Sequence, residues 1–154
     1  FYRSITKTKS NQNLWTTFMH SKKKLTGPGY AKGFEVHNAR STNKHRGRTA
    51  VVYAANKFLN PGINSFFLSN GIKIDQDKYA LSSMLQFIWR SAIRDGEKIW
   101  VYIPSERMRG LFENWLVEIT EASSVNDINR IRGVARKKVI TLNCCIKRTC
   151  ESGQ

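Results

Sequence analysis

The fold is decided by the stretch Lys98-Ile99-Trp100-Val101-Tyr102-Ile103-Pro104-Ser105. Its first six residues are rich in β-branched and aromatic side chains, which favours a buried strand over 98–103. Pro104 and Ser105 are residues that begin helices, and the apolar side chains after them recur at helical spacing. These apolar residues are Met108, Leu111, Phe112, Trp115, Leu116 and Ile119. We therefore predict a strand followed at once by an amphipathic helix.

A longer helix is predicted before this strand, over 78–94, and Asp95-Gly96 ends its pattern. Its apolar residues fall on one stripe. They are Leu81, Met84, Leu85, Ile88 and Ala92. The order helix, strand, helix is typical of the α/β class, so we predict an α/β fold in which a small sheet is packed by amphipathic helices.

Shorter patterns predict the remaining elements. The predicted helices span 11–24, 49–59, 63–67 and 125–131, and the predicted strands span 34–37 and 139–146. We divide the chain into a basic N-terminal arm with a short helix (1–33), an α/β core (34–120) and a basic C-terminal extension (121–154). A core of this length closes without disulfides or a metal ion.

The formal net charge of +15 is unevenly distributed. Residues 1–48 hold 11 Lys and Arg against one acid, residues 130–154 hold 7 against one acid, and the centre is nearly balanced. Such basic arms predict nucleic acid as the partner, with DNA favoured and phosphates as the points of contact. The alternative is a basic surface that serves solubility. The predicted phosphate contacts are Lys22, Lys23, Lys24, Arg40, Lys44, Arg46, Arg48, Arg130, Arg132, Arg136, Lys137 and Lys138.

Gln86, Arg90 and Arg94 recur every four residues in the predicted helix over 78–94. This spacing places the three side chains on one flank, where two guanidiniums can hold phosphate oxygens bidentately. A solvated basic flank explains the same spacing, so both interpretations stay open. Trp89 stacks on a base in the first interpretation and packs against the protein in the second.

A resemblance to a known family is carried by three stretches. They are 79–96, Tyr-Ala-Leu-Ser-Ser-Met-Leu-Gln-Phe-Ile-Trp-Arg-Ser-Ala-Ile-Arg-Asp-Gly; 100–109, Trp-Val-Tyr-Ile-Pro-Ser-Glu-Arg-Met-Arg; and 38–43, Asn-Ala-Arg-Ser-Thr-Asn. Together they resemble the C-terminal portion, the second RecA-like lobe, of DEAD/DEAH-type superfamily 2 helicases of phages and mobile elements. The resemblance implies a partial RecA-like lobe in which Arg90 is an arginine finger and Gln86 its positioning partner. Trp89 stands where the family has Gly, and Arg94 falls one residue later than the family's second Arg.

The sequence lacks the motifs of the nucleotide-binding lobe that completes an ATPase of this type. No Gly-x-x-x-x-Gly-Lys-Ser/Thr loop is present, and no Asp-Glu pair follows an apolar strand to hold magnesium. ATP and Mg²⁺ are therefore implied only if a nucleotide-binding lobe adjoins this chain, and Arg90, Arg94 and Gln86 would face ATP only then. No cofactor is expected for the chain alone.

The number and spacing of the cysteines indicate whether the protein resides in a reducing or an oxidising compartment. Cys144, Cys145 and Cys150 lie within seven residues, an odd number unsuited to a disulfide framework, which predicts a reducing, cytoplasmic location. No histidine lies near them to complete a zinc site. The chain has no apolar run long enough for a membrane span, so no membrane partner is expected. Phe1 in place of Met suggests a fragment or a processed product.

Two further function classes stay open. One is a stand-alone protein-interaction or regulatory module whose aromatic surface binds a protein and whose charge has no nucleic-acid role. The other is a metal-dependent nuclease that uses the acids at Asp75 and Asp77 or at Asp95 and Glu97, although these resemble turns flanking helices.

Overall fold

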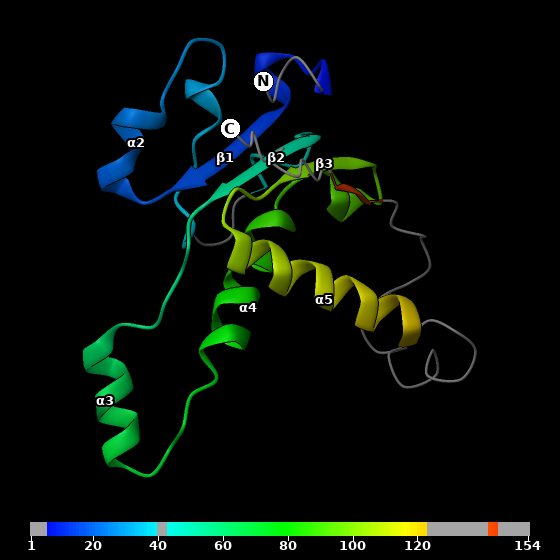
Figure 1. The fold of residues 1–154 in the computed structure, drawn as a ribbon. Helices are drawn as coiled ribbons and strands as arrows, with labels where there is room; N and C mark the ends of the chain where they lie inside the picture. The colour runs from blue at the N-terminus through cyan, green and yellow to red at the C-terminus, as the bar shows by residue number, and fades with distance from the viewer. Residues whose placement is uncertain (1–5, 40–42, 123–141, 145–154) are drawn as a thin grey trace, which may run out of the picture.

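The structure is a computed structural model and describes residues 6–39, 43–122 and 142–144. Four parallel strands form one sheet, and their order in the sheet is their order in the chain (Figure 1). The strands are β1 (Asn13–Thr17), β2 (Ala50–Ala54), β3 (Ile99–Tyr102) and β4 (Leu142–Cys144). The predicted α/β class is confirmed.

Helical segments connect the strands. The α-helices are α2 (Met19–Leu25), α3 (Pro61–Ser69), α4 (Gln76–Ile88) and α5 (Glu106–Ala122), and the 3-10 turns are η1 (Ser10–Gln12), η2 (Ala31–Gly33) and η3 (Ala92–Asp95). Crossovers of one hand between successive neighbouring strands place their helices on the same face of a sheet. Figure 1 accordingly shows α4 and α5 on one side of the sheet.

The core lies between that face and the two helices. Leu14, Val51 and Val101 stand in register on the three strands, so their side chains point to the same face. All three are at most 2% exposed, and they belong to one cluster with Phe87 of α4 and Phe112 of α5. Burial of side chains of this size contributes about 2 kcal/mol each, which makes this cluster the main source of stability.

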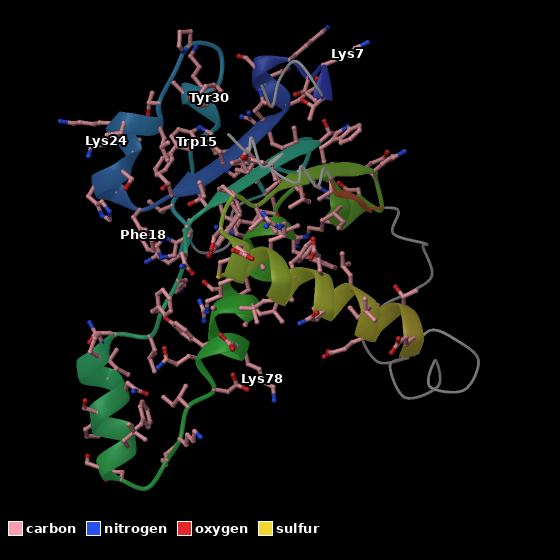
Figure 2. All side chains as sticks on the ribbon, viewed as in Figure 1. Lys7, Trp15, Phe18, Lys24, Tyr30 and Lys78 are labelled. Atoms are coloured by element: carbon pink, nitrogen blue, oxygen red, sulfur yellow. The ribbon has the colours of Figure 1, made fainter. Side chains whose placement is uncertain are left out.

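The outer edge of β1 is covered by the segment that contains η2. Phe34 forms a single parallel bridge to Trp15, and the indole Nε1 of Trp15 donates to the carbonyl of Tyr30 at 2.8 Å (Figure 2). Gly33 packs directly on β1, since a Cβ at this position would lie 2.2 Å from the carbonyl oxygen of Asn13. Only glycine permits this approach.

Helix α3 stands apart from the sheet and from the other helices (Figure 1). It begins at Pro61, and the side chain of Asn60 accepts hydrogen bonds from the amides of Gly62 and Ile63, a strong start signal. None of its residues is buried, and the side chain of Phe66 is 64% exposed. Its stability therefore comes from local capping rather than from packing against the core.

The strand predicted over 98–103 and the amphipathic helix predicted directly after it are confirmed. Strand β3 and helix α5 occupy the expected stretches, with Met108 and Phe112 fully buried. Strand β4 falls within the strand predicted over 139–146; the rest of that stretch and the helix predicted over 125–131 lie outside the described residues. No helix in the described part of the chain combines the length and apolarity needed to cross a membrane.

Three predicted elements near the N-terminus are wrong. The first half of the helix predicted over 11–24 is strand β1, and the helix predicted over 49–59 is strand β2 followed by an extended segment. The strand predicted over 34–37 is reduced to the bridge at Phe34. Short apolar runs fit both helical and strand periods, and pairing within the sheet decided in favour of strands here.

The helix predicted over 78–94 is too long. Helix α4 ends at Ile88, and Trp89 is its C-cap. The buried hydroxyl of Ser91 donates to the carbonyl of Ile88 at 2.6 Å, and the next amide, of Ala92, bonds to Arg48 instead of continuing the helix. A serine side chain that takes over a helix carbonyl in this way competes with the helix itself.

Candidate nucleic-acid interface

The last turn of α2 carries three consecutive lysines, Lys22, Lys23 and Lys24. Cations at a helix C-terminus are stabilised by the partial negative charge of the unpaired carbonyls, which suits the sequence to this position. Lys23 and Lys24 are exposed, while the Nζ of half-buried Lys22 lies 4.2 Å from the centre of the Phe34 ring. Figure 2 shows the side chain of Lys24 pointing away from the sheet.

Four more lysines of the N-terminal region are exposed: Lys7, Lys9, Lys32 and Lys44. No ion pair among the described residues involves these four or the three of α2. We call the seven together the N-terminal lysines. In Figure 2, Lys7 and Lys24 lie near the two ends of β1, far from Lys78 below α4. Sequence reasoning named four of the seven and missed Lys7, Lys9 and Lys32, although the charge count of residues 1–48 included them.

The arginines of the same region have partners within the protein. Nη1 of Arg48 donates to the carbonyl of Asn13 at 2.7 Å. Nε of Arg46 donates to both carboxylate oxygens of Asp95 at 2.7 Å, and the hydrogen bond and charge of Asp95 raise the pKa of Arg46. Both side chains therefore connect the loop before β2 to other segments.

The predicted phosphate grip of Gln86, Arg90 and Arg94 is not one helix face, because α4 ends before Arg90. The guanidinium of Arg90 is half-buried and donates to the carbonyls of Val36, at 3.3 Å, and of Ala39. Burial lowers the pKa of Arg90, and the charge of Glu35 acts in the opposite direction.

The other two members of this set are exposed. Arg94 lies in η3 and donates from Nη1 to Oδ1 of Asn43 at 2.8 Å. Gln86 stays on α4, where its amide is 3.4 Å from the hydroxyl of Ser82. Trp89 is 36% exposed and packs edge to face on Trp115, with ring centres 5.9 Å apart, which agrees with the packing interpretation.

The loop that these arginines hold is also fixed from inside. His45 is fully buried, and its Nε2 lies 2.8 Å from Oε2 of Glu35. Burial raises the pKa of Glu35, but the hydrogen bonds from His45 and from the Val36 amide outweigh it, so the pKa of Glu35 lies below its ordinary value. The arginines and this pair connect the described residues before β2, 34–39 and 43–49, to the rest of the fold.

Three of the four acids suggested for a nuclease have structural roles. Asp75 caps α4 by accepting hydrogen bonds from the amides of Asp77 and Lys78, Asp77 pairs with Arg107 at 2.5 Å, and Asp95 pairs with Arg46. Within the described residues, no three His, Cys, Asp or Glu side chains come close enough together to hold a metal ion.

The remaining predicted contacts lie outside the described residues. They are Arg40, Arg130, Arg132, Arg136, Lys137 and Lys138.

Comparison with known proteins gives two findings. Residues 1–116 match the family described as the YonV C-terminal Rossmann-like domain. Over 116 residues, 75% of this chain, the sequence is 51% identical to the SPbeta prophage-derived uncharacterized protein YonV of Bacillus subtilis (strain 168), and the match covers 28% of that protein. No solved structure matches significantly. A Rossmann-like domain and a phage-derived relative are thus established, while the helicase assignment stays a prediction.

Proposed function

Because the chain belongs to the family of YonV C-terminal Rossmann-like domains, whose fold by itself does not fix a function, we propose from its charges that it binds nucleic acid, with DNA favoured. The observation that carries the proposal is the set of N-terminal lysines, which form no ion pair among the described residues. Ammonium groups in this state can neutralise the phosphates of a nucleic acid, which then releases the cations condensed on it.

The lysines, rather than the arginines, are the proposed phosphate contacts of the described part. Lys22, Lys23, Lys24 and Lys44 are the members that the sequence also singled out. Arg46, Arg48 and Arg90 already donate to protein acceptors, so contact with phosphate would require these bonds to be shared or broken. Contacts of this kind give affinity without reading the base sequence.

The helicase resemblance adds a finer proposal. Joined to a nucleotide-binding lobe, the exposed Arg94 and Gln86 would lie within reach of ATP phosphates, and Arg90 would act as a finger only if it left the carbonyls of Val36 and Ala39. The chain alone should have no ATPase activity. An ATPase measurement with the chain alone, and with a protein that supplies a nucleotide-binding lobe added, tests this proposal.

A salt titration tests nucleic-acid binding. Binding of a short fluorescent duplex is measured from low to high salt for the wild type and for the triple variant Lys22→Gln, Lys23→Gln, Lys24→Gln. Each phosphate contact contributes about 0.9 to the negative slope of log K against log salt, so losing three contacts should reduce the slope by about 2 to 3. The matched control replaces Lys73, Lys78 and Lys98 by Gln, which removes the same charge from exposed positions outside residues 1–48.

The comparison of the two triple variants decides the matter. Equal losses of affinity in both variants would mean that net charge alone acts, and binding that does not change with salt would remove the proposal.

A second candidate, a protein-interaction module, is favoured by α3, which exposes Ile63, Phe66 and Leu68 to solvent. Binding through such a surface would persist at high salt and would be lost on Phe66→Ser.

A further inference from the structure

A cluster of aromatic and basic side chains lies where β1 and β2 end. Phe18 follows β1 directly, and the imidazole of His20 stacks on its ring with centres 5.7 Å apart and planes 8° apart. The ring of His37 meets Phe18 edge to face at 5.8 Å. The hydroxyl of Thr17 donates to the carbonyl of Ala54 at 2.9 Å, which ties the ends of the two strands together. Figure 2 shows Phe18 at this end of β1, next to the segment that leaves β2.

Lys57 brings a cation to this cluster from the segment after β2. Its Nζ donates to the hydroxyl of Ser83 at 2.7 Å and lies 4.8 Å from the centre of the Tyr79 ring, so α4 holds it in place. An ammonium group has three N–H donors, of which this contact uses one. No hydrogen bond in the described part of the chain involves the imidazole nitrogens of His20 or His37.

The cluster is electropositive. Burial lowers the pKa of His37, and the charges of Lys57 and Arg90 lower it further. Among the described residues, no carboxylate contributes to the shift in the pKa of His37, although the charge of Glu35 acts on Arg90. The charges of Lys57 and Arg90 disfavour the protonated form of His37, and an anion beside His37 would relieve this repulsion while accepting hydrogen bonds from Lys57 and the imidazoles.

The position of the cluster in the fold is that of a ligand site. In open parallel sheets, ligands bind outside the carboxyl ends of the strands, where successive loops converge. Phe18 and His20 follow the carboxyl end of β1, and Lys57 lies three residues beyond the carboxyl end of the neighbouring strand β2. An aromatic ring beside the cations adds a flat surface on which a base or sugar can pack.

We propose that Lys57, His37 and His20 bind a phosphate group, as the doubly charged monoester of a nucleotide or of a nucleic-acid end, beside the ring of Phe18. A monoester carries close to two negative charges at neutral pH, whereas a diester within a strand carries one, so the cluster favours a terminal phosphate. This site does not depend on the N-terminal lysines, and it stands whether or not they bind nucleic acid.

Histidine NMR signals test the proposal directly. The chain has three histidines, and the imidazole signals of His20 and His37 are followed while inorganic phosphate, and then adenosine monophosphate, is added at constant ionic strength. We expect saturable shifts of both signals and a rise in the pKa of His37. The signal of His45, buried against Glu35, reports that the fold is intact. Lys57→Gln should weaken phosphate binding at least tenfold, and the control Lys73→Gln should leave it unchanged.

The source of the phosphate is separated by competition. A 5′-phosphorylated oligonucleotide that binds more tightly than its 5′-hydroxyl counterpart identifies a nucleic-acid end, and adenosine monophosphate binding without this preference identifies a free nucleotide. Shifts that do not saturate, or that persist in both Lys57→Gln and His37→Gln, overturn the site. In that event, binding of unphosphorylated duplex whose affinity still falls with rising salt would leave the nucleic-acid proposal intact.

Discussion

Replacement of Arg90 by Ala should destabilise the protein strongly, because its guanidinium connects the end of α4 to the segment after η2. The side chain is half-buried and donates to two backbone carbonyls, those of Val36 and Ala39. Hydrogen bonds to a charged group contribute roughly 1.5–3 kcal/mol each, and their removal takes a donor from two half-buried carbonyls, of which that of Val36 also accepts from the amide of Ala39. Partial exposure reduces both effects, so we expect a loss of about 2–3 kcal/mol in the free energy of unfolding.

Urea unfolding followed by tryptophan fluorescence measures this loss. Arg94→Ala is the matched control, since the exposed side chain of Arg94 donates to the side chain of Asn43; it should change the stability by about 0.5 kcal/mol or less. Arg90→Lys should recover part of the stability at most, because an ammonium group cannot reproduce the planar fork. If Arg90→Ala is as stable as Arg94→Ala, the side chain is not a structural connection, and the role of a finger toward a partner lobe gains weight.

Two further predictions concern stability. Gly33→Ala should destabilise the protein by about 1–3 kcal/mol, since the new methyl group would lie 2.2 Å from the carbonyl oxygen of Asn13. Gly110→Ala lies in the interior of α5 and its methyl group would meet nothing within 4 Å, so this variant should be more stable by up to about 1 kcal/mol. Thermal unfolding of both variants checks this, and equal effects would contradict it. Because the pKa of Glu35 is lowered in the folded state, its contribution is present above its ordinary pKa of 4.5 and is lost as the pH falls through the lowered value. The stability difference between wild type and Glu35→Gln should therefore shrink from pH 7 to pH 3 in urea unfolding, and a constant difference would show that the charge of Glu35 is irrelevant.

Elements whose local sequence pattern is unambiguous were predicted correctly, and elements that depend on pairing with distant strands were not. Helix α5 has a stripe long enough to fix its period, and β3 is a run of β-branched and aromatic residues without helical spacing. Strand β2, Ala50–Ala54, has an apolar pattern that continues into 55–59 with helical spacing, so the strand is decided by pairing with β1 and β3. Such partners are far away in the sequence, which is why local patterns failed there.

The candidate site was predicted in the same uneven way. The lysines of α2 were found because charge is visible in composition, and they form no ion pair among the described residues. The cluster of His20, His37 and Lys57 was missed, because it is assembled from the first turn of α2 and from two loops, which meet only once β1 and β2 pair. The one signal in the sequence, two histidines in a basic region, does not specify this meeting.

The different roles of arginine and lysine in this protein follow from the chemistry of their side chains. Arg48 and Arg90 bind backbone carbonyls, a use that suits a planar guanidinium with five donors and weak hydration. The N-terminal lysines, whose ammonium groups are strongly hydrated, stay in water at the surface. In the described part of the chain, Arg46, Arg48 and Arg90 are held by acceptors that belong to the fold, so fewer cationic side chains are free to contact phosphates than the formal charge of +15 implies. Binding should consequently follow the number of lysines removed more closely than the number of positive charges removed.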